Sequence, residues 1–260
     1  MTAIPPVINT PPSFTDSNQA PTNDLAPRTS AATRTKRGVA NIHTLWPQNR
    51  TITIAFMDTP KEAAKIIKKA INSYAPFINL KLKFVKGNEA DIRISTPADK
   101  VGSWSHLGTN ALKVPKHKPT MQINIRHTVI STIQRDTLHE FGHALGLEHE
   151  HQHPDRTFSF NKEGIYKTFT TDLHTPKQIY DNIIHPLDPQ DLKTSAYDQK
   201  SIMHYAFNAA STSNNVEIPP NYRLTEGDKE FIKSLYPPAV RQKKLIADKL
   251  LAIRIFLKKL

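Results

Sequence analysis

The sequence predicts an α+β fold, in which short strands and one helix precede a histidine-rich helix and a more irregular segment follows it. Residues 51–95 contain three segments that alternate apolar and polar side chains, as strands do, and one segment with helical spacing. Residues 131–146 form a second helical pattern, which carries histidines. Residues 158–200 are mostly loop-like in composition, and a last helical pattern ends near residue 236.

The first half of the chain is expected to run strand, helix, strand, strand. Residues 51–56 (TITIAF), 80–84 and 91–95 alternate like strands. Residues 60–74 have helical spacing, with lysines opposite an apolar face. That face consists of Ala63, Ile66, Ile67, Ala70, Ile71 and Tyr74. Residues 120–125 (TMQINI) predict another strand, which leads into the histidine-rich helix.

Helix boundaries follow from capping residues. We expect the histidine-rich helix to begin near Ser131, because a serine hydroxyl can cap a helix N-terminus. In the second half, residues 175–184 predict one helix. The closing helix is expected over residues 224–236, with Thr225 as N-cap and Asp228 completing a capping box. Two prolines then stop that helix.

The strongest functional signal is the stretch HEFGHALGLEH, in which His139, Glu140, His143, Gly146 and His149 fit the pattern H-E-x-x-H-x-x-G-x-x-H. Residues four apart share a helix face, so His139 and His143 can bind one metal ion while Glu140 points towards a metal-bound water. Gly146 can take the positive φ that ends the helix and brings in His149. Three imidazoles leave the fourth position open, as in catalytic zinc sites.

Two histidines and a glutamate can also form the polar face of an ordinary helix. The complete pattern is much harder to meet by chance, and residues 201–205 (SIMHY) add a second signal. Here the sequence resembles the metzincin metallopeptidases, in which a methionine turn lies beneath the zinc histidines, and Met203 takes that position. Within this group, Glu150 after the third histidine and Tyr205 after the methionine are similar to the astacins.

The astacin resemblance covers about residues 45–236. It implies a metzincin-type zincin fold, with a twisted mixed sheet and two long helices above the cleft and an irregular lower subdomain ending in a helix. It further implies that Glu150 helps to anchor the mature N-terminus. Tyr205 would be a fifth metal ligand that moves to support the oxyanion, and Met203 would be structural, forming the floor under the imidazoles.

The resemblance also implies a place for the substrate. Trp104, Ser105 and His106 resemble the strand at the upper rim of the astacin cleft, along which a peptide pairs as an added strand. On local evidence alone, a buried tryptophan in a loop is an equally good interpretation. His151 and His153 look like extra ligands, but because three ligands already complete the site we expect both to be solvated surface histidines.

Together these residues predict a zinc-dependent endopeptidase with one catalytic Zn²⁺ ion. Zinc would polarise the scissile carbonyl and lower the pKa of its water. Glu140 would act as general base and then general acid, and Tyr205 would stabilise the oxyanion. The expected partner is a protein or peptide substrate, and we expect a monomer. An alternative is a latent or inactive zinc protein that binds peptides, against which the intact Glu140 argues.

The two ends of the chain differ from its middle. Residues 1–37 are rich in Pro, Thr, Ser and Asn without periodicity, which predicts a disordered tail or pro-segment. This segment ends in RTKR, which is either a basic linker or a processing site with cleavage after Arg37. Residues 38–238 are expected to form the catalytic domain, and residues 239–260 a basic amphipathic helix.

Residues 239–260 carry a net charge of +6, half of the chain's +12. The predicted helix could pack on the catalytic domain, bind a partner or lie on an anionic membrane surface. A protein that acts on membrane or nucleic acid through this helix is a second alternative function, although we do not expect nucleic acid as a partner. Charge is weaker evidence than the zinc motif, because basic stretches often only solubilise a surface.

The chain has no cysteine, which excludes disulfides and thiolate metal sites. Animal astacins carry disulfides, and Ser103 stands where a cysteine would be expected from the resemblance. We therefore expect a disulfide-free relative or folding in a reducing compartment. The first 45 residues show no apolar run of the length of a signal peptide or transmembrane helix. The compartment is not predicted; if the protein is secreted, we expect a route without a classical signal peptide.

Overall fold

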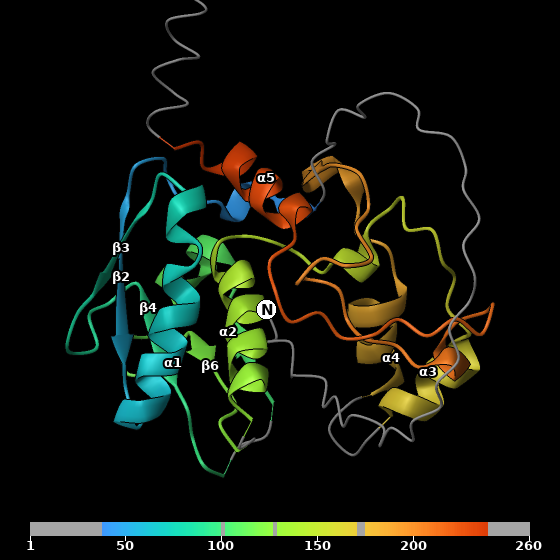
Figure 1. Cartoon of the computed structure of the whole chain (residues 1–260), viewed down its shortest axis with the longest axis horizontal. Coiled ribbons are helices and arrows are strands. Elements are labelled where there is room, and N and C mark those ends of the chain that lie inside the picture. Colours follow the sequence, from blue (N-terminus) through green and yellow to red (C-terminus); the bar gives the residue numbers. More distant parts are fainter. Residues whose placement is uncertain (1–37, 100–101, 127–128, 171–174, 239–260) are drawn as a thin grey trace, which may run out of the picture.

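The structure is a computed structural model, which describes residues 38–99, 102–126, 129–170 and 175–238 (Figure 1). The expected N-terminal tail (1–37) and basic C-terminal helix (239–260) lie outside the described residues. Their nature and boundaries therefore stay predictions.

Within the described residues the chain forms seven strands and five α-helices. The strands are β1 (Val39–Asn41), β2 (Thr51–Phe56), β3 (Lys81–Phe84), β4 (Ile92–Ser95), β5 (Trp104–Ser105), β6 (Met121–Gln122) and β7 (Leu192–Thr194). The helices are α1 (Lys61–Asn72), α2 (Ile130–Ala144), α3 (Lys162–Phe169), α4 (Pro176–Ile179) and α5 (Glu226–Leu235). The predicted α+β class is confirmed.

A five-stranded mixed sheet has the order β3-β2-β4-β6-β5. The first four strands are parallel, whereas β5 lies antiparallel to β6 at the edge. The strand predicted at residues 51–56 is β2, and Ile52 and Ile54 from its apolar face are fully buried. The strand expected at residues 120–125 is shorter than predicted, because only Met121 and Gln122 pair with neighbours as β6.

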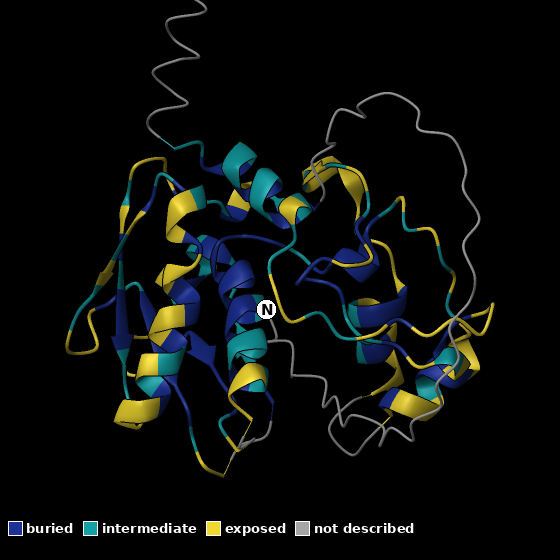
Figure 2. Ribbon diagram, in the orientation of Figure 1, coloured by how far each residue is buried: buried dark blue, intermediate teal, exposed yellow. Residues whose placement is uncertain are grey.

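Helices α1 and α2 lie side by side against one face of this sheet (Figure 1). Pro60 precedes α1, and the helix buries a stripe of small and branched residues while its lysines stay exposed (Figure 2). Just after α1, the fully buried Tyr74 donates its hydroxyl hydrogen to the Leu138 carbonyl oxygen of α2 at 2.7 Å. The first helix therefore fixes the position of the second, which carries the histidines.

Helix α2 begins one residue before the position predicted for its cap. Val129, with extended φ and ψ, is the N-cap and makes no side-chain capping bond. Ser131 is already inside the first turn, so the prediction that its hydroxyl caps the helix was wrong. The first turn is exposed, and its free N–H groups can therefore be hydrated.

The C-terminal end of α2 is held by two aromatic side chains from distant parts of the chain. Trp46 Nε1 donates to the Ala144 carbonyl oxygen at 2.7 Å, and the Tyr236 hydroxyl donates to that of Leu145 at 2.7 Å. These bonds satisfy carbonyls that a helix end leaves without partners. Gly146 follows with a φ of 92°, the positive value expected from the motif.

The second half of the chain has its own small apolar cluster, separate from the main core. It contains Ile165, Phe169, Ile179, Ile183, Ile184, Phe207 and Ile218. The helix predicted at residues 175–184 is present as α4, with a Thr175–Gln178 capping box, followed by a π-helical turn (Tyr180–Ile184). Helix α3 was not predicted. The elements that contribute to this cluster, from α3 to Ile218, form the lower half of the fold, which lies beside α2 (Figure 1).

The closing helix α5 is confirmed, with Thr225 as N-cap and Asp228 completing the capping box. Its residues Phe231, Ile232 and Leu235 are buried in the main core, next to the sheet and α2. Among the described residues, no helix has the length and apolarity needed to cross a bilayer.

Candidate metal centre and catalytic site

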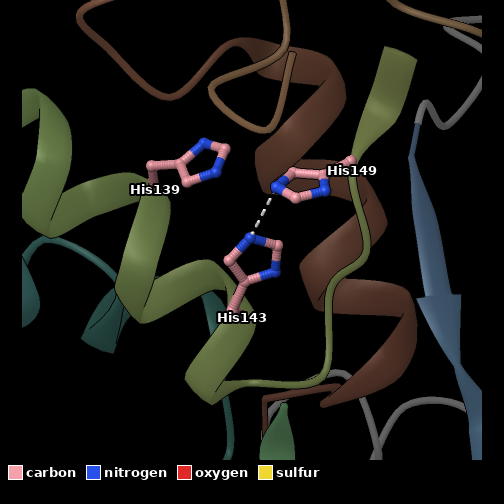
Figure 3. A group of neighbouring side chains, drawn as sticks. All are labelled: His139, His143 and His149. Carbon is pink, nitrogen blue, oxygen red and sulfur yellow. Dashed lines mark hydrogen bonds between the residues drawn. The ribbon is translucent and has the colours of Figure 1, made fainter. Parts of the chain in front are cut away.

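Three histidines converge where α2 ends. His139 and His143 lie one turn apart on α2, and His149 returns to them after the turn at Gly146 (Figure 3). Each histidine contributes one ring nitrogen, and these three nitrogen atoms all lie within 4.8 Å of one another. The structure thus brings together the three ligands predicted from the motif.

The histidine rings are oriented by backbone carbonyls that accept hydrogen bonds from the nitrogen away from the centre. His139 Nδ1 donates to the Ile202 carbonyl oxygen at 2.8 Å, and His143 Nδ1 donates to that of Leu147 at 2.7 Å. A proton on Nδ1 leaves Nε2 with a lone pair, which is the tautomer that binds a metal.

Burial keeps these imidazoles neutral. It lowers the pKa of His139 to about 4 and that of His143 to about 3, and it holds the pKa of His149 well below 6.5. The Nε2 atoms of His143 and His149 are 3.0 Å apart (Figure 3). Two nitrogen ligands on a tetrahedral zinc ion lie about 3.3 Å apart. The donor set and its spacing therefore fit a zinc ion.

Glu140 lies next to the first ligand, on the cleft side of α2. Its side chain is buried, and Oε2 has no hydrogen-bond partner among the described residues. Burial and, after it, the carboxylate of Asp136 raise the pKa of Glu140 well above 4.5. A bound dication would oppose this shift, because a nearby positive charge favours the ionised form. An unpartnered carboxylate oxygen beside a metal site is suited to hold a water molecule.

The methionine turn lies directly under α2. Met203 is buried, and a Cβ added to Gly142 would lie only 2.4 Å from its sulfur atom. Any larger residue at this point of the helix would therefore force the Met203 side chain to move. Sequence reasoning did not single out Gly142, although a glycine inside a helical pattern is itself a signal of close packing.

Asp228 holds the methionine turn in place, and this role was also missed. Its carboxylate accepts hydrogen bonds from the Ser201 hydroxyl at 2.6 Å and from the Ile202 backbone N–H at 3.0 Å. The same carboxylate caps α5 by accepting the Thr225 N–H at 2.8 Å. The capping box was predicted, but its link to a turn 26 residues earlier could not be read from the local sequence.

Tyr205 lies among the histidine rings. Its ring centroid is 4.4 Å from that of His149 and 5.6 Å from that of His139. Burial and the carboxylate of Glu140 raise the pKa of Tyr205 above its usual value, so its hydroxyl stays protonated and can donate a hydrogen bond. The structure thus places the tyrosine predicted from the SIMHY segment next to two metal ligands.

Glu150 is fully buried beneath the third ligand. Its Oε1 accepts a hydrogen bond from the Asp198 N–H at 2.7 Å, and its own N–H donates to the Met203 carbonyl oxygen. Glu150 thus contacts the loop before the methionine turn through its carboxylate and the turn itself through its backbone. The amino terminus that Glu150 is expected to anchor would exist only after cleavage before Gly38, so this role stays a prediction.

The prediction that His151 and His153 are solvated was wrong, since both are fully buried. His153 Nε2 donates to the Ser195 carbonyl oxygen at 2.7 Å, and the His151 ring stacks on Tyr205 with centroids 4.4 Å apart. Neither belongs to the group of converging ligand atoms. The lower half of the fold packs over this short segment, and a run of polar residues gives no local sign of that.

Trp104 and Ser105 form the edge strand β5, and His106 follows with its N–H donating to the Thr120 carbonyl oxygen. The interpretation of Trp104 as a buried loop residue does not hold, because it is partly exposed in a strand. Strand β5 lies beside α2. One sheet edge is therefore available near the metal centre for pairing with another chain.

A pocket opens between this edge and the methionine turn. His139, Glu140 and Tyr205 line it from the catalytic side, and Arg135 and Asn221 are among its other lining residues.

Ser103, the residue in the expected cysteine position, ties the start of β5 to α2. Its hydroxyl donates to Asp136 at 3.3 Å and accepts the Asn124 N–H at 3.0 Å. Hydrogen bonds thus hold this corner of the cleft.

Residues 38–227 match the sequence model of the peptidase family described as Astacin. The chain belongs to the astacin family. A solved structure of myroilysin is 31% identical, covers 77% of this chain and 98% of its own, and superimposes with a TM-score of 0.72. The resemblance inferred from the zinc motif and the methionine turn is confirmed.

Two further relatives match this chain less completely or at lower identity. The dorsal-ventral patterning protein tolloid of Drosophila melanogaster is 32% identical over 103 residues, which are 36% of this chain but only 9% of tolloid. The hatching enzyme HCE-1, a zinc-protease of Oryzias latipes, is 21% identical and superimposes with a TM-score of 0.52. The match covers 75% of this chain and 96% of the hatching enzyme. At this identity, the similarity shows the fold alone. Residues 38–227 form an astacin-type zinc metallopeptidase domain.

Proposed function

We propose that this protein is a zinc-dependent endopeptidase that cleaves extended peptide segments with Glu140 as its proton-transfer residue. The observation that carries this proposal is the unpartnered, buried Oε2 of Glu140 beside three neutral imidazoles whose lone pairs converge. Zinc, when bound by the three histidines, supplies a Lewis acid that polarises the scissile carbonyl and makes water more acidic.

The proton steps follow from the position of Glu140. Its ionised carboxylate accepts a proton from the attacking water and then delivers that proton to the leaving amine nitrogen. Tyr205, protonated and partly buried beside His149, donates its hydroxyl hydrogen to the developing oxyanion. Substrate lies along the edge strand β5, where Trp104, Ser105 and His106 offer main-chain groups to an extended peptide.

Glu150 and the segment before Gly38 would control activation. We infer that cleavage after Arg37 releases a new amino terminus towards the buried carboxylate of Glu150. Gly38 and Val39, which follow this site, are held by backbone hydrogen bonds: the Gly38 carbonyl oxygen accepts the Ser195 N–H at 3.1 Å. In addition, the Val39 carbonyl oxygen accepts the Glu148 N–H at 2.9 Å. N-terminal sequencing of naturally produced protein checks this inference, which fails if the mature chain begins well upstream.

The decisive experiment compares the full-length protein with its Glu140→Gln variant on an unfolded protein substrate. The amide cannot accept the water proton, so we expect cleavage to fall by about 10²- to 10⁴-fold while zinc remains bound in equal amount. A zinc-loaded variant that cleaves like the wild type would overturn the role of Glu140. If neither protein cleaves although both hold zinc, the same assay on residues 38–260 separates a latent enzyme from a peptide-binding protein.

A further inference from the structure

The Tyr205 phenol is held by ring contacts. Among the described residues, none makes a hydrogen bond to its hydroxyl; the backbone carbonyl of Tyr205 accepts one from His204 Nδ1 at 2.7 Å. The backbone is therefore tethered, whereas the ring direction depends on the side chains packed around it. A donor that must meet a developing oxyanion works only when its direction is set in advance.

Four aromatic rings of the described residues surround the phenol, and they are not equivalent. His139 and His149 are metal ligands, and Phe207 is distant, with ring centroids 6.5 Å apart. His151 alone combines a short centroid distance, 4.4 Å, with near-parallel planes at 29°. Offset stacking of this kind restricts both the tilt and the rotation of the partner ring.

The His151 ring is itself fixed. It is fully buried, its Nε2 donates to the Asn182 carbonyl oxygen at 3.3 Å, and its edges meet the rings of Phe160 and Phe207. The ring of His149 lies 4.9 Å away, so His149, His151 and Tyr205 form a triangle of mutually contacting rings. His151 thus joins the core of the lower half to the catalytic centre.

We propose that His151 is a positioning residue, whose imidazole plane is the surface that directs the Tyr205 hydroxyl at the reacting carbonyl. This inference rests on the proposed role of Tyr205 as oxyanion donor. It gives a positioning role to a histidine that is neither a metal ligand nor exposed to solvent. Because the stacking plane is the active feature, another flat ring at this position should serve better than a flexible chain that keeps the hydrogen bond to Asn182.

Two substitutions separate the ring from its hydrogen bond. His151→Gln keeps an N–H donor for the Asn182 carbonyl oxygen and removes the stacking plane, whereas His151→Phe keeps a plane and removes the donor. His153→Gln is the matched control, because His153 is equally buried two residues away and bonds Ser195, and it makes no described ring contact with Tyr205. Each variant is made in the full-length wild type and in Tyr205→Phe.

Steady-state kcat and KM on a quenched peptide, zinc content and Tm are measured for all variants. We expect Tyr205→Phe to lower kcat by about 10²-fold. His151→Gln should lower kcat by about tenfold with KM within about twofold and zinc fully bound, because a displaced donor loses transition-state contact and leaves ground-state binding intact. His151→Phe should recover most of that loss. His153→Gln should leave kcat unchanged.

The double variants decide how His151 acts. If it acts through the hydroxyl, His151→Gln has no further effect on kcat in the Tyr205→Phe background. An equal loss in both backgrounds, or no loss in the wild type, overturns the proposal while leaving the role of Tyr205 intact. A Tyr205→Phe variant with normal kcat would instead refute the oxyanion role, and this inference with it. If His151→Gln loses zinc, the Phe variant carries the test: a fall in its kcat as large as that of Tyr205→Phe also overturns the proposal.

Discussion

At the scale of single residues, the least expected feature is Arg93 in the centre of the sheet. Its side chain is fully buried in β4, and within the described part of the chain its guanidinium donates hydrogen bonds only to backbone carbonyl oxygens. These belong to Ala90, Val114, Pro115 and Lys118, at 2.8 to 3.3 Å. A buried arginine is normally paired with a carboxylate. Here carbonyl oxygens take that place, so Arg93 fastens the lysine-containing loop before β6 to the sheet.

Arg93→Met should therefore destabilise the protein strongly. The apolar side chain fills part of the space but leaves several carbonyl oxygens without donors, which we expect to cost about 3 to 5 kcal/mol in free energy of unfolding. Urea unfolding measures this change. Lys83→Met in the edge strand β3 is the control, because Lys83 is exposed and its loss should cost less than about 0.5 kcal/mol. A similar, small effect of both substitutions would contradict the structural role of Arg93.

Single residues also show where sequence reasoning succeeds and where it stops. The convergence of the three histidines, with Glu140 beside them, was predictable because the chemistry needs these residues at a fixed spacing within one helix and one turn. His151, His153 and Arg93 were not, because their burial is produced by segments 21 to 42 residues away in the chain. A polar residue gives no local sign that a distant carbonyl will satisfy it.

At the scale of elements, the position of α2 depends on its C-terminal end. The Tyr236 hydroxyl donates to the Leu145 carbonyl oxygen at 2.7 Å and accepts the Trp46 N–H at 3.1 Å. One side chain at the end of α5 therefore contacts both the end of α2 and the segment that precedes β2. The Leu145 carbonyl in this three-way contact lies only two residues after the ligand His143. The end of the metal-binding helix is thereby fixed without any contact to the metal.

Tyr236→Phe should lower the free energy of unfolding by about 2 to 3 kcal/mol, because one buried carbonyl and one buried N–H lose their partner. We expect zinc content to stay stoichiometric, since no ligand moves. Thermal unfolding with zinc analysis checks both points. Tyr180→Phe is the control, because Tyr180 is 38% exposed and its hydroxyl makes no described hydrogen bond. Equal Tm values for the two variants would show that the Tyr236 hydroxyl is dispensable.

Element boundaries and short elements were the weakest part of the sequence prediction. The long amphipathic helices α1 and α2 and strand β2 were predicted because their periodicity is sustained over several residues. Helix α3 has only eight residues and contains Gly164, which a helical pattern disfavours. The structure explains this glycine, because an added Cβ would lie 1.9 Å from the Ala210 carbonyl oxygen. The need for it comes from a segment 46 positions later, so no local rule reveals it.

At the scale of the whole molecule, the catalytic domain accounts for the family match, and residues 239–260 extend beyond it. Their net charge predicts a separate property. We expect the full chain to bind vesicles containing anionic lipid at low salt and to release them at high salt. Residues 1–238 should not bind these vesicles at either salt concentration. Vesicle co-sedimentation measures this. Both proteins should cleave a small peptide equally, and equal binding by both would assign the attachment to the catalytic domain.

The two apolar clusters of the described chain differ greatly in size, and the catalytic groups are divided between them. The helix that carries His139 and His143 packs in the larger cluster, together with Met203, whereas Tyr205 packs against the smaller one. Small clusters open at lower free energy than large ones, so on warming we expect amide hydrogens of α3 and α4 to exchange before those of α2. Over that temperature range the protein should still hold its zinc while turnover declines. Heat would then inactivate the enzyme reversibly, by loosening Tyr205, the proposed oxyanion donor, long before the metal is lost.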